Sequence, residues 1–188
     1  IIFIKQQMIK HLLNIEYNTS EETVKQRFEL IAKQLFNQYE IIKGEKTYDF
    51  LEIEFYFYSN NHPDTTTYKR NMPAGQWHTH LSGVDITFES NDDYYGGVLI
   101  RSIIDHENKV INGPLCTLIE LFDNIDIEGG CMNIPLIRKK TNSYTIHIES
   151  TTRFGINSGI YKGSKYRYYN TSKDIKWKSS YTANPTRK

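Results

Sequence analysis

The sequence is poor in cysteine and proline and has no long hydrophobic run. Its 188 residues include two cysteines, Cys116 and Cys131, and five prolines. Two cysteines are too few for a disulfide-stabilised scaffold, and they do not have the spacing of a zinc site. No apolar stretch approaches the ~20 residues of a membrane-spanning helix. Residues 1–13 carry charges such as Lys5, and no small-residue cleavage site follows them, so we expect no signal peptide and a cytoplasmic protein.

The composition is typical of one folded domain. Hydrophobic residues make up 38% of the chain and charged residues 24%, which excludes a disordered or fibrous protein. At ~150 residues per domain, the length predicts a single domain over residues 1–188.

Hydrophobic periodicity predicts an α+β fold, with helices first and a curved, largely antiparallel sheet or partial barrel afterwards. Residues 3–14 have an amphipathic pattern. A second helix is expected to start at residues 19–22 (TSEE), which match a capping box, and to stop at Gly44. We therefore expect a helical N-terminal segment, 1–45, and an α+β body, 46–188. The body is expected to contain strands at 48–58, 84–88, 98–104 and 144–149, a helix at 115–123 and a loop at 157–165.

Charge is divided unevenly along the chain. Residues 1–130 hold 11 Lys and Arg against 20 Asp and Glu, a net charge of −9, whereas residues 131–188 hold 12 against 2, a net charge of +10. The basic part also holds eight aromatic residues. Cations neutralise phosphates and rings stack on bases, so this part favours a nucleic-acid partner. The alternative is that the basic surface pairs with the acidic part of the same chain.

One strand carries an unusual polar face. Side chains alternate along a strand, so residues 51–58 place four apolar side chains on one face and two carboxylates with two phenols on the other. This polar face consists of Glu52, Glu54, Tyr56 and Tyr58. It is either a solvated sheet surface or a general base beneath an aromatic-lined pocket.

Two further features point to chemistry. His78 and His80 share a face if they lie on a strand, and with Asp85 they have the ligand types of a metal site; the alternative is a pair of hydrogen-bonded histidines. Arg101 interrupts an apolar run, so it requires a carboxylate partner such as Glu54.

Several short motifs occur in an order that resembles the alkyladenine (3-methyladenine) DNA glycosylase family. The resemblance covers roughly residues 48–170 and leaves the N-terminal helices outside it. The motifs are residues 52–56 (EIEFY), His62, 73–75 (PAG), 97–102 (GVLIRS), 113–116 (GPLC), 153–156 (RFGI) and 166–169 (YRYY).

The resemblance implies an enzyme of base-excision repair that flips a damaged purine into a pocket and hydrolyses its N-glycosidic bond, with neither metal nor cofactor. By position, Glu54 matches the carboxylate that activates water, and Arg101 matches the arginine beside it. The expected substrate contacts are Tyr56, His62 and His80, to which we add Asp85; the candidate DNA contacts in the basic segment are Lys162, Lys165 and Arg167.

The chain departs from the family at residues 81–83 (LSG), where the family has a wedge tyrosine before a glycine. A single strand or a free nucleoside is therefore an alternative substrate. Two other functions remain open: a non-catalytic nucleic-acid-binding relative, and a cupin-like metal-binding barrel built on His78 and His80.

Overall fold

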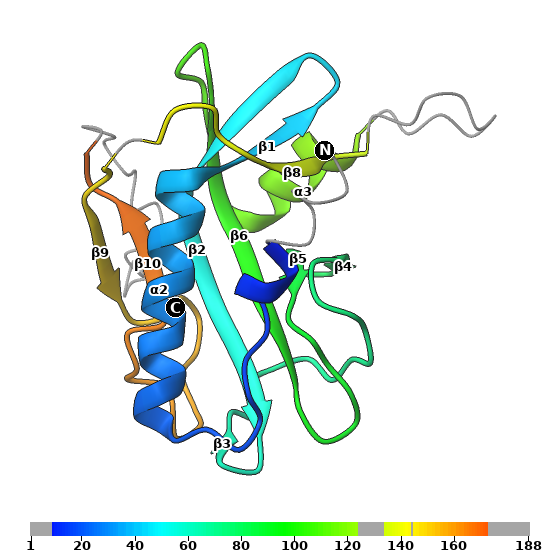
Figure 1. The fold of residues 1–188 in the computed structure, drawn as a ribbon, viewed down its shortest axis with the longest axis vertical. Coiled ribbons are helices and arrows are strands. Elements are labelled where there is room, and N and C mark those ends of the chain that lie inside the picture. Colours follow the sequence, from blue (N-terminus) through cyan, green and yellow to red (C-terminus); the bar gives the residue numbers. More distant parts are fainter. Residues whose placement is uncertain (1–8, 124–133, 144, 173–188) are drawn as a thin grey trace, which may run out of the picture.

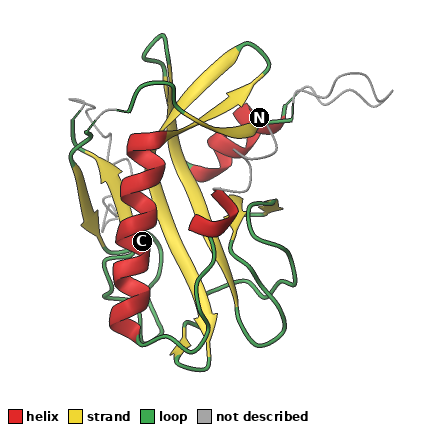
Figure 2. Ribbon diagram, in the orientation of Figure 1, coloured by secondary structure: helices red, strands yellow, loops and turns green. Residues whose placement is uncertain are grey.

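The computed structural model describes residues 9–123, 134–143 and 145–172, and these form an α+β fold (Figures 1 and 2). Residues 9–12 are helical. The helices that follow are α2 (Glu21–Gln38) and α3 (Pro114–Phe122). The strands are β1 (Tyr39–Lys43), β2 (Lys46–Ser59), β3 (His62–Pro63), β4 (Trp77–His80), β5 (Gly83–Thr87), β6 (Tyr95–Asp105), β7 (Val110–Asn112), β8 (Leu136–Lys139), β9 (Ile148–Thr151) and β10 (Arg167–Asn170).

The strands form one curled antiparallel sheet, a half-barrel. Its main order is β4-β5-β6-β2-β1-β8, and every pairing is antiparallel. The long strands β2 and β6 run side by side through the centre of the molecule (Figure 1). The other edge of β2 pairs in turn with β1, β10 and β3. The sheet therefore branches at β2, and this strand is the one with the polar face predicted from the sequence.

Helix α2 covers one face of β2 and supplies much of the core. Its buried apolar residues recur at helical spacing, and the ring of Phe28 stacks on Phe55 of β2 with centroids 4.5 Å apart. The helix starts at Glu21, within the predicted start at residues 19–22, and the side chain of Ser20 caps it by accepting a hydrogen bond from the Thr23 amide. It ends at Gln38, where the chain passes directly into β1.

Gly44 does not end this helix, which corrects the sequence prediction. With φ of 57° it lies in the turn between β1 and β2, a conformation that glycine adopts at little cost. The segment 1–45 therefore contains a strand as well as helices. The predicted strands 48–58 and 98–104 lie within β2 and β6, and 84–88 and helix 115–123 differ from β5 and α3 by one residue at each end. The predicted strand 144–149 is wrong in its bounds, since β9 begins at residue 148.

Candidate active site

A cavity of about 640 Å³ opens on the face of the sheet that bears Glu54. This volume lies within the range of ~300–1,000 Å³ typical of small-molecule sites. Tyr56, Arg101 and Phe154 line one part of it, and Arg70, His80 and Asp85 line another. Leu99, on β6, lies in the sheet between the two groups.

The pairing of five strands places the polar residues of the site in one row. Arg167 lies opposite Glu54, Glu54 opposite Leu99, Leu99 opposite Asp85, and Asp85 opposite His78. Residues directly opposite each other in antiparallel strands share a face. One intervening strand separates Glu54 from Asp85, which puts their backbones about 10 Å apart. The two carboxylates therefore stand at opposite sides of the cavity.

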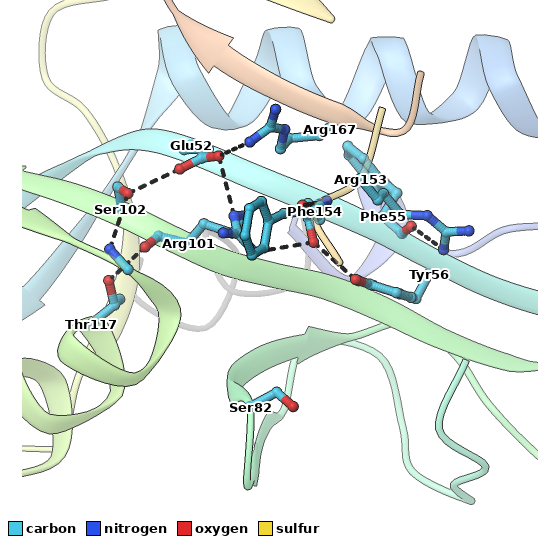
Figure 3. Close-up of polar contacts among 12 residues, drawn as sticks. Glu52, Phe55, Tyr56, Ser82, Arg101, Ser102, Thr117, Arg153, Phe154 and Arg167 are labelled. Carbon is cyan, nitrogen blue, oxygen red and sulfur yellow. Dashed lines mark hydrogen bonds and ion pairs between the residues drawn. The ribbon is translucent and has the colours of Figure 1, made fainter. Parts of the chain in front are cut away.

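Glu54 is fully buried, and both of its carboxylate oxygens are held. The Phe154 amide donates to Oε1 over 2.7 Å, the Tyr56 hydroxyl donates to Oε2 over 2.8 Å, and Nη1 of Arg101 lies 3.4 Å from Oε2 (Figure 3). Burial raises the pKa of Glu54 above its ordinary value, and the Arg101 charge and the two hydrogen bonds offset only part of this rise. Glu54 is thus a carboxylate poised to take up a proton. It lies behind Tyr56, Arg101 and Phe154 and does not itself line the cavity.

Glu52 holds the Arg101 side chain in position. Its Oε1 accepts from Nε of Arg101 over 3.1 Å and from Nη1 of Arg167 over 3.0 Å, and its Oε2 accepts from the Ser102 hydroxyl over 3.1 Å. Consecutive residues of a regular strand point to opposite faces, yet Arg101 and Ser102 both reach this carboxylate. The register of β2 and β6 shifts on either side of Glu52, and such an irregularity redirects side chains. The predicted need of Arg101 for a carboxylate is therefore met by both Glu52 and Glu54.

A second arginine fixes Tyr56. The Arg153 side chain is buried, and its Nη1 donates to Oδ2 of Asp64 over 2.6 Å and to the Phe55 carbonyl over 3.3 Å. Its guanidinium lies over the Tyr56 ring, 4.6 Å from the centroid. The next residue is Phe154, whose amide binds Glu54. The loop after β9 therefore orients the phenol and the carboxylate together.

Asp85 has the opposite environment from Glu54. Its Oδ2 accepts from Nη1 of Arg70 over 2.6 Å, and its Oδ1 lies 3.0 Å from Nε2 of His80. Burial acts to raise the pKa of Asp85, but His78, His80 and the Arg70 charge outweigh it and hold the pKa well below its usual range. Gly97 makes room for this arrangement, because a Cβ there would lie 3.1 Å from Nη1 of Arg70 and 2.8 Å from a backbone carbonyl.

The two histidines and Asp85 have ligand atoms within 4.8 Å of one another, the arrangement that suggested a metal site. Two contacts argue against a metal ion at this position. The Ser82 amide donates to Nδ1 of His80 over 3.2 Å, so the ring proton belongs on Nε2, which then donates to Asp85 and has no lone pair for a metal. Arg70 already neutralises Asp85. These contacts favour the hydrogen-bonded alternative.

His62 does not reach the cavity, which corrects the prediction that it contacts substrate. It is fully buried on the other side of β2, where its Nδ1 donates to the Phe57 carbonyl over 2.8 Å and its Nε2 accepts from the Tyr166 hydroxyl over 3.0 Å. Its ring stacks on Tyr161 with centroids 4.0 Å apart. Burial lowers the pKa of His62, so a neutral ring is the form that fits this core position.

Within the described part of the basic segment 131–188, four cations pair with carboxylates of the acidic part of the chain. Lys162 and Lys165 are exposed, but Arg167 is half-buried and binds Glu52, so its observed role is structural. Residues 131–133, 144 and 173–188 lie outside the described part. The ion pairs across the two charge regions are Arg138–Glu40, Lys140–Asp49, Arg153–Asp64 and Arg167–Glu52.

Sequence reasoning did not identify several of the residues that contact the two carboxylates and Tyr56. Arg70 lies in a segment without periodicity and Arg153 begins the motif 153–156, but nothing in the sequence links Arg70 to Asp85 or Arg153 to Tyr56. Gly97 had a usable signal, because a glycine inside a strand marks a close approach of another group. Phe154 belongs to a recognised motif, but only the structure shows its amide at Glu54.

Comparison with known proteins gives no family. No family model matches the sequence, and no curated protein does. None of the helices in the described part of the chain combines the length and the hydrophobicity needed to cross a membrane. The chemistry of the site is therefore the basis for inferring function.

Proposed function

We propose that this protein is a divergent relative of the alkyladenine DNA glycosylases that hydrolyses the N-glycosidic bond of a modified purine bound in the cavity. Glu54 is the base that activates water. The observation that carries the proposal is the buried Glu54 carboxylate with its raised pKa, held by Tyr56, Arg101 and Phe154, all three of which line the cavity.

The raised pKa of Glu54 suits a general base, because such a base works best when its pKa lies near the operating pH. Water gives a proton to Glu54 while its oxygen bonds to C1′ of the sugar. The C1′–N bond breaks, its electron pair leaves with the purine, and solvent protonates the departing base. The Glu54 charge also stabilises the oxocarbenium-like sugar of the transition state, as carboxylates do in glycoside hydrolysis.

Tyr56 contributes to the same step through both its hydroxyl and its ring. Its hydroxyl orients Glu54, and burial together with the Glu54 charge raises the pKa of the phenol, so the phenol stays a donor. Its ring also lines the cavity, as does His80. Rings around a base stabilise it by ~1–3 kcal/mol per stacked base. A flipped purine would therefore lie between the Tyr56 and His80 parts of the wall.

The test is single-turnover release of free base from oligonucleotides that contain hypoxanthine, ethenoadenine or 3-methyladenine. We expect release by the natural protein and a loss of about 10²- to 10⁴-fold in Glu54→Gln, the usual contribution of a general base. Glu29→Gln, which changes an exposed acid of α2 paired with Lys33, is the control and should keep the full rate. Release by Glu54→Gln at the rate of the natural protein would overturn the proposal.

One observation favours a second candidate, a nucleic-acid-binding protein without catalysis. Glu54 lies behind the cavity wall, so water must pass between Tyr56, Arg101 and Phe154 to reach it. In that case the same oligonucleotides would bind the natural protein and Glu54→Gln equally, with no base released from any of them.

A further inference from the structure

Exposed apolar side chains surround the cavity. Tyr68 is 50% exposed, Leu115 53% and Phe154 38%, and all three line the cavity. Leu81 is 99% exposed at the turn between β4 and β5, between two residues that also line it. We call these four residues the apolar rim. A cluster of exposed apolar residues around a concave site marks a binding surface.

The rim comes from four separate parts of the chain. Tyr68 belongs to the segment between β3 and β4, Leu81 to the next turn, Leu115 to the start of α3, and Phe154 to the loop after β9. Figure 3 shows Ser82, the neighbour of Leu81, across from the strands that carry Tyr56 and Arg101. Burial within the fold does not explain this convergence, since each side chain remains open to solvent.

The two arginines that line the cavity, and Arg153 over the Tyr56 ring, are paired with carboxylates of the same chain. Arg70 pairs with Asp85, Arg101 with Glu52 and Glu54, and Arg153 with Asp64. On the outer surface, Lys69, the neighbour of Tyr68, lies 3.3 Å from Asp92. Among the described residues that line the cavity, the rim therefore offers hydrophobic contact and no arginine or lysine without a carboxylate partner.

A DNA duplex and a single strand present different surfaces to such a rim. A duplex shows phosphates and sugars outside and stacks its base faces inside, so it offers few base faces to aromatic side chains, while cations contribute to the binding of either form. An unpaired strand exposes base faces, on which aromatic side chains stack. Tyr68 is an exposed ring of this kind. The open part of Phe154 is another, although Arg101 lies over its ring, 5.2 Å from the centroid.

We propose that the apolar rim binds the unpaired bases that flank the target base, so that the ligand of this protein is single-stranded DNA. The inference rests on the proposed function in one respect, that the target base enters the cavity. The inference goes beyond the proposed function by naming single-stranded DNA as the ligand and the four residues that select it over a duplex.

The test is binding of an undamaged, fluorescently labelled 15-nucleotide strand and of the same sequence as a duplex, since undamaged DNA separates binding from catalysis. We expect the single strand to bind at least 10-fold more tightly. Its affinity should fall only weakly with salt, with a logarithmic slope that corresponds to about two phosphates or fewer. Tighter binding of the duplex, or a slope that corresponds to six or more phosphates, would overturn the proposal.

Variants of the rim sharpen the test. Tyr68→Ala and Phe154→Ala should each weaken single-strand binding about 5- to 150-fold, the range for one stacked base. Tyr68→Phe retains the ring and should bind as the natural protein does, and Leu30→Ser, an exposed apolar residue of α2, is the control outside the rim. Unchanged binding by both alanine variants would contradict the proposal, as would a mononucleotide that binds as tightly as the 15-nucleotide strand.

The two proposals fail differently. If the rim variants lose binding but no modified base is released, the rim is supported and the glycosylase function is wrong. If base is released from a duplex and the rim variants bind normally, the glycosylase function stands and the rim is wrong.

Discussion

Glu54 and Asp85 are buried carboxylates on the same face of the same sheet, one strand apart, yet their pKa values shift in opposite directions. Asp85 has Arg70 at 2.6 Å and His80 at 3.0 Å. Glu54 has its nearest guanidinium, that of Arg101, at 3.4 Å, and it shares that cation with Glu52. The difference is thus in the hydrogen bonds from His78 and His80 and the Arg70 charge that Asp85 receives, and not in burial.

This contrast separates a structural anion from a reactive one. A carboxylate that is fully neutralised by its own arginine stabilises the fold and has little affinity for a proton. A buried carboxylate with an incomplete partner retains a raised pKa, the property expected of a general base. Under the proposed function, the comparison assigns Asp85 to stability and Glu54 to chemistry, and three substitutions test that assignment.

The largest effect is expected from Asp85→Asn. Removing one member of a buried ion pair leaves the Arg70 charge uncompensated, which costs about 3–5 kcal/mol of unfolding free energy. The pKa of Asp85 is depressed in the folded protein, so its stabilisation is present above the ordinary carboxyl pKa of ~3.9 and is lost as the pH falls below it. The measurement is urea unfolding at pH 7 and at pH 3.5.

Asp92→Asn, which changes an exposed acid paired with Lys69, is the matched control and should alter stability by less than about 1 kcal/mol. The double variant Arg70→Met, Asp85→Asn should recover part of the loss, because it leaves no buried charge alone. A loss of less than ~1 kcal/mol of unfolding free energy in Asp85→Asn would show that Asp85 does not have the structural role assigned to it.

A smaller effect is expected from Gly97→Ala, which leaves both members of the Asp85 pair in place. The added Cβ would lie 2.8 Å from the Ile86 carbonyl and 3.1 Å from Nη1 of Arg70, so the backbone must shift and the guanidinium must give by a few tenths of an ångström. Overpacking of this kind costs about 1–3 kcal/mol. Gly163→Ala, where a Cβ meets no atom within 4 Å, is the control. Thermal unfolding measures both, and equal stability of the two variants would show that the close approach of Ile86 and Arg70 does not depend on Gly97.

Sequence reasoning predicted the surroundings of Glu54 more closely than those of Asp85. Alternation along β2 placed Glu52, Glu54 and Tyr56 on one face, because strand geometry fixes which side chains share a face. It did not show that this face is buried. The residue that closes over this face is Phe154, about a hundred positions along the chain, and no local sequence pattern predicts such a contact.

The errors have a similar cause. His62 follows an acidic strand and belongs to a recognised motif, but its ring belongs to a core formed with Tyr161 and Tyr166 from a distant loop. β1 was missed because the chain turns from helix into strand at Tyr39 with no glycine or proline between them. In both cases tertiary packing decides what local sequence leaves open.

The smallest effect on stability, and the sharpest test of the comparison, is the pH dependence of Glu54→Gln. The folded protein has a raised Glu54 pKa, so it binds more protons at this site than the unfolded chain does. Stability from this site is therefore full below the ordinary glutamate pKa of ~4.3 and falls as the pH rises through the folded-state value. Glutamine is neutral at every pH and removes that loss.

The melting temperature of Glu54→Gln should therefore match that of the natural protein at pH 4 and exceed it at pH 8. Asp85→Asn should show the opposite trend, with its deficit largest at pH 8. A variant that is more stable but inactive is the signature expected of a residue kept for chemistry at the expense of the fold. If Glu54→Gln instead loses stability as the pH rises, the partners of Glu54 outweigh its burial as those of Asp85 do, and the two carboxylates do not differ in role.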